Sequence, residues 1–141
     1  MFQRIVVGTD GSGTAAAAVR HAAELCKTFG AELIAVSAYS TPREAPPPLA
    51  DAQGFPGSEV AAGLLEDVEK RYGSQVKMRT IAREGSAADA IIEVAEAESA
   101  DLIVVGNKGM TSAKRFLLGS VPNAVSHHAP CHVLIVHTTD E

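Results

Sequence analysis

Short apolar runs alternate with longer segments of helical periodicity along the chain. Five runs are expected to form β-strands, at residues 4–8, 32–38, 76–82, 101–106 and 132–137. In the first, fourth and fifth runs the apolar residues are consecutive and mostly Val, Ile or Leu, which is typical of strands that helices cover on both faces. The alternation predicts an α/β domain built on an open, parallel, doubly wound sheet with helices on both faces.

Four helices are expected between these strands. Serine is a preferred residue at a helix start, and the predicted starts lie at or near the serines at positions 12, 58, 86 and 120. Gly30 and Gly73 are predicted to end the first two helices, because glycine readily adopts the left-handed conformation found there. Pro122 falls in the first turn of the fourth helix, where its missing N–H interrupts no intrahelical hydrogen bond.

The two predicted edges of the sheet differ in pattern. Residues 76–80 alternate apolar with polar, which indicates an edge strand with one wet face. The run at 132–137 lacks this alternation and, in the strand order 3-2-1-4-5, forms the opposite edge. An apolar edge is usually covered by a partner, so we expect a homodimer through residues 132–137.

Segment 41–57 joins the second strand to the second helix and contains five prolines. Proline lacks a backbone N–H, so we expect neither helix nor strand here, and the segment is predicted to be a flexible, solvated linker. A second interpretation is a lid over a binding site, because such loops leave the carboxyl ends of the strands, where ligands bind in α/β sheets.

Composition and charge narrow the functional classes. The 141 residues are 46% hydrophobic, which is enough for one compact domain over residues 1–141. Twelve Lys and Arg against 17 Asp and Glu give a net charge of −5 without a basic block, so nucleic acid is not an expected partner. No membrane span or signal peptide is recognised, and we expect a cytoplasmic protein with no membrane association and with reduced Cys26 and Cys131.

A glycine pattern follows the fourth apolar run. The segment Gly106–Gly109 is followed, after nine further residues, by Gly119 and Ser120. Glycine lets the backbone approach an anion closely, and a helix that begins at Ser120 directs its free N–H groups toward the same point. The pattern therefore predicts a phosphate-binding site, in which Lys108 and Arg115 either neutralise phosphate charge or remain solvated surface groups.

The order 3-2-1-4-5 reverses direction between the first and fourth strands, and ligands in open α/β sheets bind beyond this switch point. The loops there are residues 9–12 and 106–109, so topology and glycine chemistry select the same place. Asp10 is a candidate to accept hydrogen bonds from ribose hydroxyls or to hold a divalent ion with water; alternatively it caps the first helix. Ser120 has the same two interpretations, a phosphate contact and a helix cap.

Other chemistry finds less support in the sequence. His127, His128, Cys131 and His132 cluster along the chain, but Pro130 separates the histidines and no second ligand pair is present, so a metal site is not expected. Neither a Walker sequence nor G-x-S-x-G occurs, and no acid–base pair accompanies Asp10. We assign no catalytic residue, and at most slow hydrolysis is expected.

Taken together, residues 5–12, 102–109, 119–121 and 133–136 resemble the universal stress protein (UspA) family, and the likeness extends over nearly the whole chain. The family's ATP-binding signature is G-x2-G-x9-G-[ST], which Gly106, Gly109, Gly119 and Ser120 match in this sequence. The resemblance implies a Rossmann-like adenine nucleotide alpha hydrolase-like fold with strand order 3-2-1-4-5. It further implies ATP at the switch point, with or without magnesium, and dimerisation through the last strand.

The resemblance also implies a set of nucleotide-binding residues. Gly8, Thr9 and Asp10 would border adenosine and ribose, Ala38 would meet adenine, and the glycine pattern would wrap the phosphates. The complete set is Gly8, Thr9, Asp10, Ala38, Val105, Gly106, Lys108, Gly109, Gly119, Ser120, Val121 and Pro122. Pro122 replaces a small hydroxyl residue frequent in ATP-binding members and removes one N–H donor.

Residues 119–122 look like those of an actinobacterial branch in which cyclic AMP binding is known, so cyclic AMP is an alternative ligand. The function expected from the resemblance is a stress-response regulator that binds adenine nucleotide. Two further alternatives are a slow ATPase or nucleotidyl transferase and a dimeric scaffold with an empty site.

Overall fold

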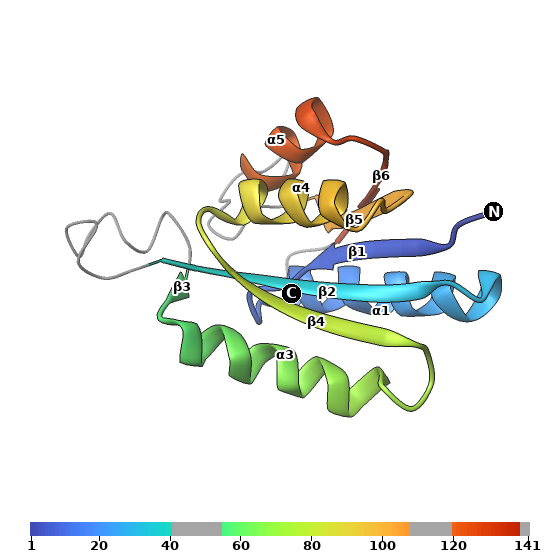
Figure 1. Cartoon of the computed structure of the whole chain (residues 1–141), viewed down its shortest axis with the longest axis horizontal. Coiled ribbons are helices and arrows are strands. Elements are labelled where there is room, and N and C mark those ends of the chain that lie inside the picture. Colours follow the sequence, from blue (N-terminus) through green and yellow to red (C-terminus); the bar gives the residue numbers. More distant parts are fainter. Residues whose placement is uncertain (41–54, 108–119, 139–141) are drawn as a thin grey trace.

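The computed structural model describes residues 1–40, 55–107 and 120–138 (Figure 1). The strands are β1 (Arg4–Gly8), β2 (Glu32–Ser40), β3 (Phe55–Pro56), β4 (Met78–Glu84), β5 (Leu102–Gly106) and β6 (His132–Val136). The helices are α1 (Gly13–Phe29), α3 (Ser58–Tyr72), α4 (Ala87–Ala97) and α5 (Ser120–His128). These elements form the predicted βα alternation.

The five predicted strands pair in parallel in the order β4-β2-β1-β5-β6, which confirms the predicted order 3-2-1-4-5. β1 pairs with β2 from Arg4 opposite Glu32 and with β5 from Ile5 opposite Leu102. The direction of strand addition therefore reverses between β1 and β5, and the carboxyl ends of these two strands lie side by side.

The short strand β3 was not predicted. Phe55 and Pro56 pair with Tyr39 and Ser40, so the expectation that segment 41–57 contains no strand is wrong at these two residues; residues 41–54 lie outside the described part. Tyr39 also pairs with Glu84 of β4, so β3 lies on the other side of β2, beyond the end of β1. Two residues at the end of a sheet tolerate the missing N–H of proline.

Helices cover both faces of the sheet, with α1 and α3 on one side and α4 and α5 on the other (Figure 1). Ile5 and Val7 of β1 pack among residues of α1, whereas Val6 packs among residues of α4 and α5, and all three side chains are fully buried. Burial on both faces explains why this strand is continuously apolar.

The helix ends agree with the capping predictions at Ser12, Ser86 and Gly30, whereas Gly73 ends α3 in the right-handed conformation, with φ at −63°. Ser12 Oγ accepts a hydrogen bond from the Ala15 N–H at 3.2 Å, and Ser86 Oγ accepts one from the Asp89 N–H at 3.3 Å. Gly30 ends α1 in the left-handed conformation, with φ at 68°. The cap at Ser12 starts α1 only four residues after β1 ends, so the amino end of this helix lies at the carboxyl end of the strand.

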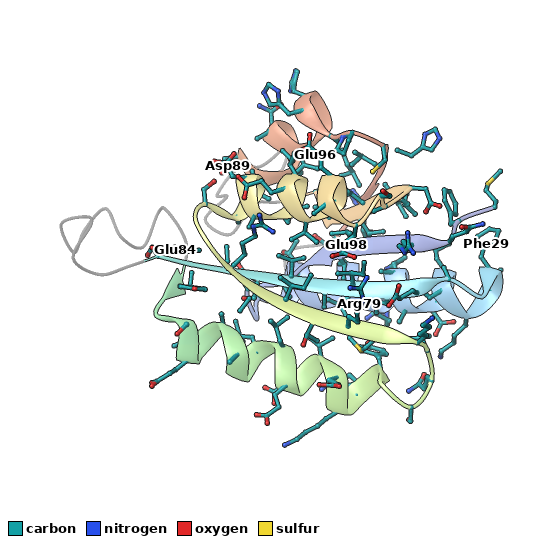
Figure 2. All side chains as sticks on the ribbon, in the orientation of Figure 1. Phe29, Arg79, Glu84, Asp89, Glu96 and Glu98 are labelled. Atoms are coloured by element: carbon teal, nitrogen blue, oxygen red, sulfur yellow. The ribbon has the colours of Figure 1, made fainter. Side chains whose placement is uncertain are left out.

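A group of ion pairs joins the sheet to the end of α4. Glu32 of β2 accepts from Arg79 of β4 at 2.8 Å and lies 3.6 Å from Arg4 of β1. Arg79 also contacts Glu98 at 2.6 Å, and Figure 2 shows these two side chains pointing toward each other. The hydrogen bond from Arg79 lowers the pKa of Glu32 against a smaller opposing effect of burial.

Candidate functional site

A crevice lies at the predicted switch point. Its lining residues come from the ends of β1 and β5 and from the starts of α1, α4 and α5. They are Gly8, Asp10, Ser12, Thr14, Ala15, Ile91, Val105, Gly106, Val121 and Pro122. Six of these were predicted site residues, and the structure adds Ser12, Thr14, Ala15 and Ile91. The cavity measures about 30 Å³, which is enough space for a water molecule.

The turn between β1 and α1 is organised by its own side chains. Asp10 Oδ1 accepts from the Ser12 N–H at 2.8 Å, and Thr9 Oγ1 accepts from the Gly11 N–H at 3.3 Å. Because Ser12 caps α1, the alternative that Asp10 caps this helix is wrong. Among the described residues, no hydrogen bond to Asp10 Oδ2 is found, so this oxygen remains available to a ligand.

Two glycines of the crevice lie in close contact with neighbouring helices. A Cβ at Gly8 would lie 2.5 Å from Ile91 Cδ1 of α4. A Cβ at Gly106 would overlap the Thr14 side chain of α1 and lie 3.2 Å from the Thr14 carbonyl oxygen. Real Cβ atoms essentially never approach others below 3.0 Å. These glycines therefore let helices from opposite faces of the sheet approach the ends of β1 and β5.

The first turn of α5 forms another wall of the crevice. Val121 and Pro122 line it, and the Pro122 side chain is fully buried. Ser120 is the first helical residue and is exposed. The N–H groups in this turn have no intrahelical acceptor and can bind an anion, but Pro122 contributes none.

Two other predicted residues, Ala38 and Thr9, do not line the crevice. Ala38 is 3% exposed and packs in the core beneath α4, and Thr9 lines a separate cavity. Lys108, Gly109 and Gly119, together with Arg115, lie outside the described residues.

The separate cavity lies between α1 and α3, on the face of the sheet opposite α4. Its volume is about 200 Å³, larger than that of the crevice. It is lined by Thr9, Gly11, Ala16, Val19, Leu64, Asp67, Val68, Arg71 and Tyr72. Thr9 and Gly11 border this cavity while Asp10 and Ser12 border the crevice, so the turn after β1 separates the two.

Asn107, which lies in the predicted loop 106–109 but was not assigned as a site residue, is bonded to the end of the chain beyond β6. Its N–H donates to the Val136 carbonyl at 2.8 Å, and its Oδ1 accepts from the N–H and the hydroxyl of Thr138 at 3.0 and 2.8 Å. No sequence signal could have identified this contact, because the two residues lie 31 positions apart.

The cysteines and histidines offer little chemistry. Burial raises the pKa of the Cys26 thiol to about 12, so the thiol stays protonated at neutral pH. His127 Nδ1 donates to the Asn123 carbonyl at 2.8 Å within α5. Over residues 1–40, 55–107 and 120–138, no group of three His, Cys, Asp or Glu side chains could hold a metal ion.

No helix among these residues has both the length and the apolar character needed to span a membrane.

Comparison with known proteins identifies the family. The sequence model of the universal stress protein family matches residues 1–137. The chain belongs to the universal stress protein family. Universal stress protein Rv1636 of Mycobacterium tuberculosis (strain ATCC 25618 / H37Rv) is 39% identical over 146 aligned positions, which cover 98% of each chain.

Solved structures of universal stress proteins share the fold. UspA from Lactobacillus plantarum has a TM-score of 0.80 at 25% identity, with 96% of this chain and 97% of that chain covered. A universal stress protein in complex with cAMP has a TM-score of 0.74 at 33% identity, with 98% of each chain covered. The resemblance inferred from the sequence is thereby confirmed.

Proposed function

We propose that this universal stress protein is a stress-response regulator that binds an adenine nucleotide in the crevice between β1 and β5. The observation that carries the proposal is the convergence of Asp10 and the first turn of α5 on one crevice at the switch point. The uncommitted carboxylate oxygen suits a ribose hydroxyl, and the free N–H groups suit a phosphate. The cAMP complex of a relative with 33% identity supports this ligand class.

The cavity is smaller than the ligand. Small-molecule sites commonly measure about 300 Å³ or more, whereas the crevice measures about 30 Å³. We infer that nucleotide binding widens the crevice. Ala38, which the family resemblance places next to adenine, is 3% exposed and belongs to the same packed cluster as Ile91 of α4.

ATP and cyclic AMP are the two candidate ligands. The glycine pattern that resembles the family's ATP signature favours ATP, and Lys108, Gly109, Gly119 and Ser120 would then surround its phosphates. A magnesium ion would arrive with the triphosphate and find a carboxylate ligand in Asp10. Pro122 favours cyclic AMP, because a helix start with one N–H fewer suits a single phosphate charge better than a triphosphate.

The predicted homodimer belongs to the same proposal. β6 is an edge strand that pairs with β5, and Leu134 is 37% exposed on it. A second copy placed against residues 132–137 would cover this leucine and pair the free strand edge. The cytoplasmic location expected from the sequence likewise remains a prediction.

Calorimetric titration of the purified chain with ATP and with cyclic AMP, each with and without magnesium, tests the proposal. Asp10→Asn retains an acceptor for the Ser12 N–H but removes the charge, and we expect it to weaken binding by about tenfold or more. Glu96→Gln, an exposed change near the end of α4 that borders neither cavity, is the matched control and should leave affinity unchanged. Absence of heat from both nucleotides would contradict the proposal and favour the scaffold alternative.

A further inference from the structure

The end of β5 is bonded to the residues that follow β6. The ladder between these strands ends at the pair Gly106 and Val136. Immediately beyond it, the Asn107 N–H donates to the Val136 carbonyl at 2.8 Å, and Asn107 Oδ1 accepts two hydrogen bonds from Thr138. We call this arrangement the Asn107–Thr138 clasp. It extends the connection between two parallel strands past their last paired residues.

The chemistry of Thr138 fixes the orientation of the Asn107 amide. A backbone N–H can only donate, so the amide atom 3.0 Å from it must be the oxygen. The Thr138 hydroxyl donates to the same oxygen at 2.8 Å, and both bonds are partly buried. With both lone pairs of Oδ1 engaged, the side chain of Asn107 is held by two donors as well as by its own backbone bond.

Asn107 occupies a position from which it can control the nucleotide site. It follows Gly106, which lines the crevice, and precedes Lys108 within the G-x2-G part of the glycine pattern. Fixing its side chain and its N–H restricts the backbone angles of this residue, and these angles determine the direction in which the chain leaves β5.

We propose that Asn107 and Thr138 are positioning residues, which hold the first part of the phosphate-binding segment in the orientation that nucleotide requires. This inference rests on the proposed function, and it adds that two residues outside the crevice, Asn107 and Thr138, affect nucleotide affinity. Binding energies are reciprocal, so a clasp that improves nucleotide affinity must itself be stabilised by nucleotide. β6 would then respond to nucleotide through its own end, although no residue of this strand lines the crevice among the described residues.

Nucleotide affinity of three variants tests the positioning role. Thr138→Val removes the hydroxyl donor with little change in shape, and we expect affinity to fall about three- to tenfold. Asn107→Ala removes both side-chain bonds and should weaken binding further, whereas Thr138→Ser retains the hydroxyl and should restore affinity. Thr28→Val is the matched control, because the Thr28 hydroxyl donates to the Glu24 carbonyl at 3.1 Å near the end of α1 remote from the crevice.

Amide hydrogen exchange provides a readout that does not depend on nucleotide. The Thr138 N–H should exchange slowly in the wild-type chain, faster in Asn107→Ala, and more slowly when nucleotide is added to the wild type. Unchanged affinity in both Thr138→Val and Asn107→Ala would overturn the positioning role. If the wild type binds neither nucleotide, the proposed function fails, and hydrogen exchange then tests the clasp separately. Rapid exchange of the Thr138 amide overturns the clasp as well. Slow exchange that becomes faster in Asn107→Ala supports the clasp.

Discussion

Gly106→Ala is expected to destabilise the protein, although glycine in a strand is ordinarily unfavourable. Replacing glycine by alanine reduces the entropy of the unfolded chain and by itself would stabilise by about 0.4–1 kcal/mol. Against this, the new methyl group would overlap Thr14 Cγ2 and lie 3.2 Å from the Thr14 carbonyl oxygen. Overpacking of this kind costs about 1–3 kcal/mol. The steric effect is the larger, so we expect the free energy of unfolding to fall by about 1–2 kcal/mol.

Two further variants isolate the cause. Thr14→Ser removes the Cγ2 atom that the new methyl group would strike, so adding it to Gly106→Ala should recover about half of the loss; part of the cost remains because the Thr14 carbonyl is backbone. Gly63→Ala is the matched control, since a Cβ there has no heavy atom within 4 Å and the residue lies inside α3. This control should stabilise by up to about 1 kcal/mol.

Urea unfolding followed by circular dichroism measures the wild type and the three variants, and the midpoint and slope together give the free energies. A Gly106→Ala protein as stable as the wild type would refute the packing argument. So would a double variant no more stable than Gly106→Ala alone, because the predicted clash is with the atom that serine lacks.

Three other properties can be measured. The pKa of Glu32 is lowered in the folded state, mainly by the hydrogen bond from Arg79, so its contribution to stability should be complete above pH 4.5 and be lost as the pH falls through the folded-state pKa. In Glu32→Gln, the urea midpoint should therefore depend less on pH between pH 3 and 6. An unchanged pH profile would contradict the pairing. Cys26, with a pKa raised to about 12, should react with iodoacetamide more slowly than the half-buried Cys131 in native protein at pH 8. Mass spectrometry of peptides measures both rates, and earlier modification of Cys26 would contradict its burial. Leu134→Glu should convert the proposed dimer to a monomer in light scattering, and a monomeric wild type would contradict the dimer.

The topology could be predicted from the sequence because each of the five predicted strands has a recognisable pattern of apolar residues. Val6 and its neighbours are apolar without alternation, since helices cover both faces of β1, and Ser12 and Gly30 mark the ends of α1. β3 could not be predicted in the same way. Its two residues include proline, and the strand exists because β2 extends to Ser40 and offers a free edge beyond the end of β1.

The location of the crevice was predictable, but its lining depends on contacts between distant segments. Loop position and glycine content pointed to Asp10 and Gly106, which do line one crevice. Ile91 also lines the crevice because α4 packs over the end of β1, and no local sequence pattern predicts this contact. The bond between Asn107 and Thr138 is invisible in sequence for the same reason.

The packing of Gly8 and Gly106 changes how the glycine pattern should be interpreted. A Cβ at Gly106 would meet the side chain and the backbone carbonyl of Thr14, and a Cβ at Gly8 would meet the end of the Ile91 side chain, whether or not a nucleotide is bound. A binding protein differs from a scaffold in groups that packing does not require, above all Asp10 Oδ2, to which no hydrogen bond is found among the described residues. For this reason a change at Asp10 tests nucleotide binding more directly than a change at either glycine.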